Sequence, residues 1–536
     1  MREIKCHFDK AQYLIGEPVS LCLDSAFISP RIRLFGLAKE VMAELRLLEG
    51  QVVIEALCKG NYGIVVEEGT LFWEGAFDIV SSMSEVTRYG FLADFLPEDS
   101  ENKACEWMKD LHINAVQFYD WMYRHDSFLP PKEEYLDPLG RKLSMVTVKK
   151  RISDCVKAGM RPFAYGAVYA ATEETYRLHR DWAMYTMDGE PMRFADWLFY
   201  MDISESSGWT ELLTQQYISA IRIGFFGIHM DTYGFPKHVW NYTGKPIDLS
   251  EEFPKLISRI AKEVKAIQPH GGVIFNAVNN WPVESVANAP QDAVYIEVWP
   301  PNTRYIDLYT LIREAKLLSG KQVVLAAYLK PFSDPSTEKA EAAFRLCWAA
   351  ICASGGTQLV LGEDAGILQD SYYVNYAHLR KEFLCTVQKY CDFLVRYADL
   401  MYNDAGADVT KTASGGINED IQFSSNFCDF SVDAKENTVW TIVRQSAARI
   451  SVQLVNLCGN TSEWNEGKNT PREVPEIDLK LRIDRPVLGI YCASPDGEAL
   501  GARELSFSCY NTPEGRVYKA SLPMLKYWNT VWAELG

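Results

Sequence analysis

Two carboxylates in this sequence have the surroundings that acid–base chemistry on a sugar requires. Asp231 closes the apolar run 224–231, and Glu297 lies near the end of the run 293–299. Tyrosine or tryptophan flanks each of them. An aromatic surface stacks against the C–H face of a sugar ring, and its low polarity raises the pKa of a nearby carboxyl group. The pair is therefore typical of glycoside cleavage by one ionised and one protonated carboxyl.

Polar residues also close the other apolar runs of the central region. Eight such runs cover residues 89–95, 114–120, 161–169, 224–231, 272–278, 293–299, 323–328 and 357–363. The polar residues at their ends are Asp94, Asp120, Tyr165 or Tyr169, Asp231, Asn276, Glu297, Tyr328 and Glu363. An aspartate at such a position often only caps the next helix, which is the alternative for Asp94. For Asn276 and Glu363 the alternative is that they only tie loops together.

The elements that must position these residues predict an α/β barrel. Segments with apolar residues at helical spacing separate the runs, among them 101–111, 147–158, 209–223, 256–267 and 340–353. Near-continuous apolar strands followed by helices indicate a parallel sheet with both faces covered. Eight units within residues 86–402 favour a (β/α)8 TIM barrel over an open sheet, and chemistry in that fold gathers at the C-terminal ends of the strands.

The chain is predicted to carry β domains on both sides of the barrel. Residues 1–85 contain short strand-like runs broken by turn residues, including 31–37, 42–48 and 51–57. Residues 403–536 return to that pattern, with β-branched and aromatic runs at 439–443, 450–455 and 488–491. We expect a small sandwich before the barrel and an antiparallel sandwich after it.

Composition and motifs exclude several other functions. The formal net charge of −17 disfavours nucleic acid and anionic lipid as partners. No apolar run reaches the length of a membrane span. The sequence has no HExxH, GxGxxG, GxxxxGK[ST] or GxSxG motif. We therefore expect no metal and no cofactor.

Cysteine usage and the N-terminus favour a reduced, cytoplasmic protein. The 13 cysteines form no CxxC pair and have no regular spacing, and several of them, such as Cys105, Cys155 and Cys347, lie within helical apolar patterns. The first residues lack the apolar core of a secretion signal, so we expect a cytoplasmic location. If a signal had been removed from the chain, the protein would be a secreted one.

The blocks around the predicted strand ends resemble glycoside hydrolase family 66, the dextranases and cycloisomaltooligosaccharide glucanotransferases. The resemblance runs in order through residues 88–95, 117–125, 164–169, 230–231, 275–279, 295–299 and 361–363, and the opening segment 9–19 also resembles that family. It covers nearly the whole chain.

This resemblance implies an immunoglobulin-like N-terminal domain, a catalytic barrel and a C-terminal β-sandwich. It also implies a retaining mechanism on α-1,6-linked glucan, with Asp231 as the nucleophile and Glu297 as the acid/base. We predict that Tyr89, Asp94, Asp120, Trp121, Tyr165, Asn276, Trp299 and Glu363 bind the substrate. Among these, Trp121 and Trp299 are expected to stack on sugar rings, and Asp94 and Asp120 to bind hydroxyls.

Two departures from the family pattern bear on the reaction. Cyclising members carry an extra carbohydrate-binding module after the seventh strand, whereas here a helix is expected to begin near Thr337, soon after Tyr328. Hydrolysis is therefore favoured over cyclisation. Without an export signal, short isomaltooligosaccharides become the expected substrate alongside dextran. The alternatives are a transglycosylase, another α-glycosidase on the same scaffold, and an inactive sugar-binding protein.

Overall fold

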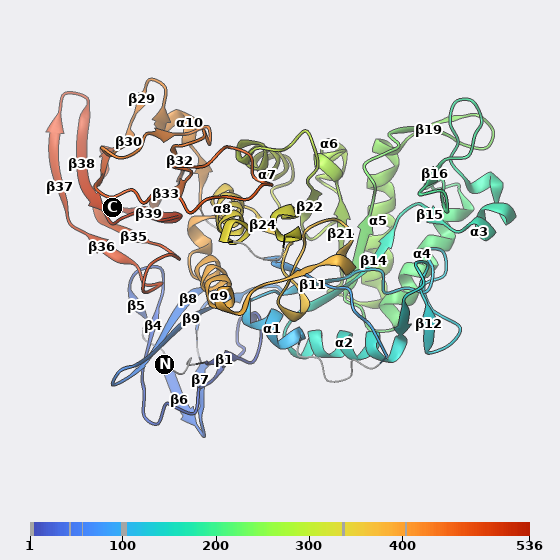
Figure 1. Cartoon of the computed structure of the whole chain (residues 1–536), viewed down its shortest axis with the longest axis horizontal. Helices are drawn as coiled ribbons and strands as arrows, with labels where there is room; N and C mark the ends of the chain where they lie inside the picture. Colours follow the sequence, from blue (N-terminus) through green and yellow to red (C-terminus); the bar gives the residue numbers. More distant parts are fainter. Residues whose placement is uncertain (1–4, 42–43, 56, 98–103, 335–337, 403–404) are drawn as a thin grey trace.

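The chain is centred on an eight-stranded parallel sheet that nearly closes into a barrel (Figure 1). The computed structural model describes residues 5–41, 44–55, 57–97, 104–334, 338–402 and 405–536. In spatial order the strands are β10 (Tyr89–Leu92), β11 (Ala115–Phe118), β14 (Arg161–Ala167), β18 (Gly227–Asp231), β21 (Gly272–Asn276), β22 (Val294–Glu297), β23 (Val323–Ala326) and β24 (Thr357–Gln358). A parallel bridge between Phe91 and Gly362 links the two edges of the sheet.

Helices follow the strands, as the alternating pattern predicts. They are α1 (Ala104–Asp110), α2 (Met145–Lys157), α4 (Gly208–Arg222), α5 (Leu249–Ile267), α6 (Val283–Val286), α7 (Tyr305–Ser319), α8 (Glu338–Ser354) and α9 (Lys381–Arg396). All eight predicted strands are present, which confirms the barrel. The first residues of the predicted helix 101–111 and the expected helix start at Thr337 lie outside the described residues. The helix α8 begins at Glu338, twelve positions after β23 ends at Ala326.

Burial and capping explain why these segments form their elements. Every residue of β10, β11, β14, β21 and β23 is buried, because helices cover the outer face and side chains fill the interior. Asp248 caps α5 by accepting a hydrogen bond from the Ser250 amide, and α7 ends at Gly320, whose φ is 65°.

Polar side chains complete the closure at the N-terminal ends of the strands. Gln322, just before β23, accepts a hydrogen bond from the Thr87 amide at 2.7 Å and donates to the Thr87 carbonyl at 3.0 Å. The hydroxyl of Thr357 donates to the same carbonyl at 2.9 Å. The seam between β10, β23 and β24 is thus sealed at its base by hydrogen bonds to one buried residue.

The long connection after β14 builds a small sheet of its own, which the sequence analysis did not anticipate. It contains β15 (Ala170–Ala171), β16 (Arg193–Phe194) and β17 (Leu198–Tyr200), in the order β15-β17-β16, and it lies at one end of the molecule (Figure 1). The turn between β16 and β17 places Ala195 and Asp196 at φ of 50° and 61°, a left-handed conformation that non-glycine residues adopt at a cost. This excursion reaches the mouth of the barrel.

Mainly antiparallel sheets flank the barrel at both ends of the chain. Before it lie the sheets β1-β3-β7-β6 and β2-β9-β8-β4-β5, which enclose a separate apolar cluster. Their strands are β1 (His7–Phe8), β2 (Tyr13–Leu14), β3 (Val19–Cys22), β4 (Arg31–Phe35), β5 (Glu40–Val41), β6 (Glu44–Leu48), β7 (Gln51–Glu55), β8 (Gly60–Glu68) and β9 (Leu71–Val80). Residues 42–43 of the predicted strand 42–48 and residue 56 of the run 51–57 lie outside the described residues.

After the barrel, two sheets enclose a further apolar cluster. The larger sheet has the order β27-β32-β33-β39-β35-β36, with β31 beside β32, and the smaller has the order β30-β34-β38-β37. The strands of the larger sheet are β27 (Ala407–Asp408), β31 (Phe430–Ser431), β32 (Val439–Gln445), β33 (Arg449–Asn456), β35 (Val487–Ala493), β36 (Arg503–Leu505) and β39 (Trp528–Leu535). Those of the smaller sheet are β30 (Ile421–Ser424), β34 (Ile477–Arg482), β37 (Phe507–Thr512) and β38 (Gly515–Leu522). The predicted boundary at residue 403 lies outside the described residues, and the boundaries stay predictions.

The two flanking regions also touch each other beside the barrel. The Glu74 carboxylate accepts a hydrogen bond from the Leu500 amide at 2.7 Å, and Lys39 forms an ion pair with Glu534 at 3.2 Å. None of the described helices is both long enough and apolar enough to cross a membrane.

The expectation of fully reduced cysteines is wrong at one pair. A disulfide joins Cys428 to Cys458, which are 30 residues apart in sequence. The spacing of the cysteines in the sequence gave no sign of this disulfide. The segments that carry Cys428 and Cys458 are brought together by the pairing of β31 with β32 and of β32 with β33. The other described cysteines are free thiols.

Replacing Gln322 by alanine tests the seam at the base of the barrel. The variant leaves the buried Thr87 amide without its partner, so we expect a loss of about 1–3 kcal/mol in the free energy of unfolding, measured by urea denaturation. Gln215→Ala is the matched control, because among the described residues that exposed side chain makes one hydrogen bond, to Glu211, and its loss should change stability by less than about 0.5 kcal/mol. Equal midpoints for the two variants would contradict the role of Gln322.

Candidate active site

A cavity of about 1030 Å³ opens at the C-terminal ends of the barrel strands. Six of the predicted site residues line it, namely Asp120, Tyr165, Asp231, Asn276, Glu297 and Trp299. They come from β14, β18, β21 and β22 or from the residues just after β11 and β22. The strand-end rule therefore located the mouth of the barrel correctly.

One amide group lies between the two central carboxylates. Asn276 Nδ2 donates to Asp231 Oδ1 at 2.8 Å and to Glu297 Oε2 at 3.1 Å. The sum of the 2.8 Å and 3.1 Å contacts, 5.9 Å, is the upper limit for the separation of these two oxygens. The amide is held in this orientation because its Oδ1 accepts a hydrogen bond from the Glu297 amide at 3.3 Å.

Each carboxylate has a phenol of its own on its other oxygen. Tyr165 donates to Asp231 Oδ2 at 2.8 Å, and Tyr328 donates to Glu297 Oε1 at 2.9 Å. The two phenols belong to one connected group of rings. Tyr119 packs on Tyr165 at 5.1 Å and stacks on Tyr373 at 4.4 Å, and Tyr373 meets Tyr328 at 6.0 Å. Each carboxylate is therefore held by Asn276 at one oxygen and by a phenol at the other.

Burial controls the charge of this pair. Loss of solvent raises the pKa of both carboxyl groups, and the negative charge of Glu297 raises the pKa of Asp231 further, to about 7. Hydrogen bonds from Asn276 and from the two phenols act in the opposite direction, because they stabilise the ionised forms. Two carboxyl groups this close titrate as a coupled pair.

His229 forms part of the cavity floor without adding charge. It lies two residues before Asp231 on β18, and its Nδ1 is 3.1 Å from the Tyr89 hydroxyl. Burial lowers the pKa of His229 to about 3, so the imidazole is neutral and does not help to ionise the carboxylates. Its contacts, including the ring packing with Tyr165 and Tyr295, are those of a residue that supports the floor.

Two groups of aromatic side chains line the cavity. One contains Trp299 and Tyr328, whose ring centroids are 6.2 Å apart, together with the Tyr119–Tyr373 stack. The other comes from β16, the turn after it and the segment after β18, where Phe194 stacks on Tyr233 at 4.3 Å and Trp197 packs near His125 at 6.1 Å. Such groups provide flat apolar faces beside the carboxylates.

Trp299 is held in place by the neighbouring rim loop. Asn279, in a left-handed conformation with φ of 50°, accepts hydrogen bonds from the Trp299 amide at 2.7 Å and from Asn302 at 3.1 Å. It donates to the Pro300 carbonyl at 3.1 Å. The Trp299 side chain is 40% exposed, so its ring remains available on the cavity side.

Sequence reasoning missed several residues that line the cavity. They are Tyr119, His125, Phe194, Tyr233, Lys237, Tyr372 and Tyr373. Tyr119 directly precedes Asp120 and was within reach of the strand-end rule. Tyr372 and Tyr373 belong to a loop far beyond β24, and Phe194 belongs to the unanticipated small sheet, so strand ends gave no signal for them.

Trp121 and Tyr89 do not line the cavity, and their contact with substrate stays a prediction. Trp121 is fully buried, donates to the Tyr165 carbonyl at 3.2 Å and packs on Phe225 at 4.8 Å. Its chain turns at Asp120, where φ is 46°, and this turn directs the tryptophan into the core. Tyr89 lies behind His229 and is only 2% exposed.

Asp94 and Glu363 form a structural link and do not line the cavity, and their substrate-binding role stays a prediction. Glu363 Oε1 accepts hydrogen bonds from the Ala93 and Asp94 amides at 2.7 and 2.9 Å, which ties the segment after β24 to the end of β10. Burial raises the pKa of Glu363 to about 8. Asp94 Oδ1 accepts from the Leu96 amide at 3.1 Å in a local turn.

Asp120 remains a candidate for contact with a ligand. It lines the cavity, and its carboxyl group makes no hydrogen bond with the described part of the chain. Burial raises its pKa to about 7, while Arg141 opposes that shift. Within the described residues, no group of three or more histidine, cysteine, aspartate or glutamate side chains is arranged to hold a metal ion.

Comparison with known proteins identifies similar chains. The model of the family described as Glycosyl hydrolase family 66 matches residues 61–532. A cycloisomaltooligosaccharide glucanotransferase of Niallia circulans is 24% identical to this chain over an alignment of 627 residues. The alignment covers 88% of this chain and 64% of that protein. A dextranase of Streptococcus salivarius is 22% identical, over 81% of this chain and 61% of that protein. The chain thus spans less than two thirds of the length of these relatives.

Solved structures show the same architecture. A Paenibacillus cycloisomaltooligosaccharide glucanotransferase complexed with cycloisomaltoheptaose superposes with a TM-score of 0.89 at 21% identity, covering 99% of both chains. An α-amylase from Geobacillus thermoleovorans reaches 0.51 at 10% identity, over 84% of this chain and 99% of that one. At these identities the likeness concerns the fold.

Two conservative variants distinguish the effects of the two phenols, Tyr165 and Tyr328, on the carboxyl groups. Tyr165→Phe removes a donor that favours ionised Asp231, so we expect the pKa of Asp231 to rise while Glu297 responds less. Tyr328→Phe should raise chiefly the pKa of Glu297. The measurement is a carbon-13 NMR titration of selectively labelled aspartate and glutamate carboxyl groups, and each variant controls the other. Identical shifts in both variants, or none, would contradict separate control of the two groups.

Proposed function

The chain belongs to glycosyl hydrolase family 66, and on that premise we propose that it cleaves α-1,6-glucosidic bonds of dextran or isomaltooligosaccharides with retention of configuration. Asp231 is the proposed nucleophile and Glu297 the proposed acid/base. The printed names of the relatives, a dextranase and cycloisomaltooligosaccharide glucanotransferases, support this substrate class.

The observation that carries the proposal is the amide shared by the two carboxylates. Because Asn276 Nδ2 contacts Asp231 Oδ1 at 2.8 Å and Glu297 Oε2 at 3.1 Å, these two oxygens lie at most 5.9 Å apart. Retaining glycosidases separate their carboxyl groups by about 5–5.5 Å, whereas inverting enzymes need about 6.5–9.5 Å to place a water molecule. The geometry therefore favours direct attack by a carboxylate over attack by water.

In the first proposed step, ionised Asp231 attacks the anomeric carbon while Glu297 transfers its proton to the departing oxygen. The bond to the leaving sugar breaks and a β-glucosyl ester of Asp231 forms. In the second step, ionised Glu297 removes a proton from water, whose oxygen displaces Asp231 and releases the α-product. The first step requires one proton on the pair, carried by Glu297.

The surrounding residues support these steps. Asn276 contacts both carboxylates and keeps them on the same side of the cavity, and Tyr165 stabilises the ionised nucleophile. Trp299 offers an exposed ring beside Glu297, and Asp120 offers a free carboxyl group to sugar hydroxyls. A sugar-binding protein without activity would not require two carboxylates at this separation.

Transfer to a second sugar is the other candidate reaction. Two relatives carry the name of a glucanotransferase, and the cavity walls are mainly aromatic, which favours a saccharide acceptor over water. Incubation with dextran and with isomaltotriose, followed by product sizing and anomer detection by proton NMR, separates the reactions. Glucose and short oligosaccharides indicate hydrolysis, while products longer than the substrate or cyclic products indicate transfer.

The organisation of the chain is proposed in the same way. We assign residues 1–85 to an immunoglobulin-like domain, residues 86–402 to the catalytic barrel and residues 403–536 to a β-sandwich. The sheet orders on either side of the barrel support this division. A cytoplasmic location, with short isomaltooligosaccharides as substrates, remains a prediction from the sequence.

Azide distinguishes the roles of the two carboxylates, because the anomer of the glycosyl azide that forms depends on which carboxylate has been removed. With α-isomaltosyl fluoride as donor, Asp231→Ala should lose most of its activity and regain it with azide, because azide enters the vacated space and gives the β-glycosyl azide. Glu297→Ala should still form the ester, and azide should then give the α-glycosyl azide. Glu382→Gln, an exposed carboxyl on α9, is the control and should keep wild-type rates. Exchanged anomers would reverse the two roles.

The pH profile provides an independent check on the protonation of the two carboxyl groups. For dextran, kcat/KM should be bell-shaped, because activity requires one ionised and one protonated carboxyl group. In Glu297→Gln the neutral amide replaces the protonated acid, and fluoride needs no proton to depart. With α-isomaltosyl fluoride this variant should therefore keep the acidic limb and lose the basic limb. A basic limb that persists would show that another group is the acid.

A further inference from the structure

The loop 459–469 of the C-terminal region reaches the mouth of the barrel. It belongs to the connection between β33 and β34, and it lies against the rim loop that follows β22. The Trp464 amide donates to the Thr303 carbonyl at 2.9 Å, and the Tyr305 amide donates to the Ser462 carbonyl at 2.9 Å. An antiparallel bridge lies between these two bonds. The loop therefore pairs with the rim as two short strands pair with each other.

The indole of Trp464 holds the residue that in turn holds Trp299. Its Nε1 donates to the Asn302 carbonyl at 2.9 Å. The Asn302 amide donates to the Trp299 carbonyl at 3.1 Å, and the Asn302 side chain donates to Asn279, which also accepts from the Trp299 amide. Trp464 is only 3% exposed and packs in the same apolar cluster as the barrel. The buried indole thus supports the whole chain of contacts that leads to Trp299.

The next residue of the loop, Asn465, supports a second segment beside Glu297. Asn465 Oδ1 accepts a hydrogen bond from the Lys330 amide at 2.9 Å. Lys330 lies two residues after Tyr328, whose phenol donates to Glu297 Oε1 at 2.9 Å. The two segments that carry Trp299 and Tyr328 are therefore held by adjacent residues of one loop.

Contacts within the loop fix its shape. Asn460 Nδ2 donates to the Asn469 carbonyl at 3.0 Å, and the Asn469 amide donates to Asn460 Oδ1 at 2.9 Å. The buried Lys468 side chain donates to Thr461 Oγ1 at 2.8 Å and lies 5.5 Å from the centre of the Tyr305 ring on α7. The disulfide described above anchors the residue just before the loop. These constraints let the loop resist movement of the rim.

The loop supports the cavity without forming part of its lining. Among the described residues that line the cavity, none belongs to residues 459–469. A change in this loop therefore leaves every side chain that would meet the sugar unaltered in type. It acts only through the position of the two rim segments.

We propose that Trp464 and Asn465 are positioning residues for the part of the active site around Glu297. They hold the two rim segments that place Trp299 and Tyr328 beside Glu297, so the C-terminal region takes part in the first step. The inference rests on the proposed function, because it assumes that Glu297 protonates the departing oxygen. Loss of either contact should slow a step that needs this proton and spare a step that does not.

Replacing Asn465 tests the proposal with two substrates. Isomaltotriose requires protonation of its departing oxygen, whereas the fluoride of α-isomaltosyl fluoride departs without a proton. Asn465→Ala should lower kcat/KM for isomaltotriose by about three- to tenfold, the effect of one hydrogen bond, and change kcat/KM for the fluoride by less than about twofold. Asn465→Asp should restore the rate with isomaltotriose, because a carboxylate also accepts from the Lys330 amide.

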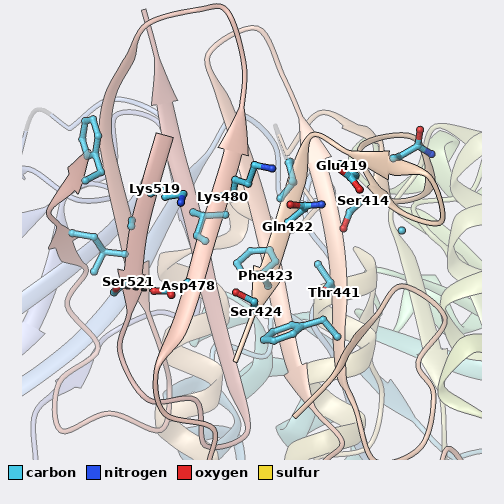
Figure 2. A pocket seen from close by; sticks show the side chains of 18 of the residues that line it. Ser414, Glu419, Gln422, Phe423, Ser424, Thr441, Asp478, Lys480, Lys519 and Ser521 are labelled. Atoms are coloured by element: carbon cyan, nitrogen blue, oxygen red, sulfur yellow. Dashed lines mark hydrogen bonds between the residues drawn. The ribbon is translucent and has the colours of Figure 1, made fainter. Parts of the chain in front are cut away.

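Gln422→Ala is the matched control and should keep the parent values on both substrates. This amide belongs to β30 and lines a separate cleft of about 1120 Å³ in the C-terminal sheets, which shares no lining residue with the barrel cavity (Figure 2). A loss of rate in Gln422→Ala equal to that in Asn465→Ala would overturn the proposal.

The second variant, Trp464→Phe, keeps an aromatic ring in the buried position and removes the donor to Asn302. It should give the same difference between the two substrates. Amide hydrogen exchange, followed by mass spectrometry, should become faster in residues 299–305 of Trp464→Phe and in residues 328–333 of Asn465→Ala.

Equal losses on the two substrates would overturn the proposal, because a smaller fraction of folded enzyme has that effect. It would also be overturned by an Asn465→Asp variant as slow as Asn465→Ala, or by unchanged exchange in both rim segments. If the parent chain does not cleave isomaltotriose, the proposed function fails, whereas the exchange measurement still shows whether the loop holds the rim.

Discussion

The active site depends on one side-chain amide that is shared by two acids. Asn276 donates both of its contacts from a single nitrogen, and its oxygen is held by the backbone of Glu297 itself. Two buried carboxyl groups at this distance repel when both are ionised. The amide offsets part of that repulsion without supplying a positive charge, and it holds the two acids close together. A lysine or arginine in its place would ionise both acids.

The rest of the barrel mouth keeps this arrangement rigid. Phenols hold the outer oxygens, stacked rings hold the phenols, and a neutral histidine closes the floor. The rim loop after β21 holds the one after β22 through Asn279, which fixes the exposed ring of Trp299. At the opposite end of the strands, hydrogen bonds to Thr87 seal the seam. Each of these groups limits the movement of the side chains that it contacts.

Much of this architecture could be predicted from sequence, because apolar runs and helical spacing report burial directly. The same rule located Asp231, Asn276 and Glu297, since the ends of parallel strands share one edge. It could not show that Trp121 turns into the core, because a strand end does not reveal which way the next side chain turns. It could not show that Glu363 ties two segments together, since a buried carboxylate that accepts two backbone amides has the same sequence signature as one that faces a ligand. Tyr373 and the Cys428–Cys458 disulfide depend on distant segments that no local pattern connects.

The small sheet inserted after β14 has a consequence for how such an enzyme acquires new substrates. It supplies one wall of the cavity from a hairpin tip, while both acids sit on strands inside the barrel. Changes in the length or sequence of this hairpin would reshape the space for a sugar chain without disturbing the catalytic core. Natural variation, or deliberate grafting of hairpins between relatives, would then alter chain-length selectivity at little risk to folding.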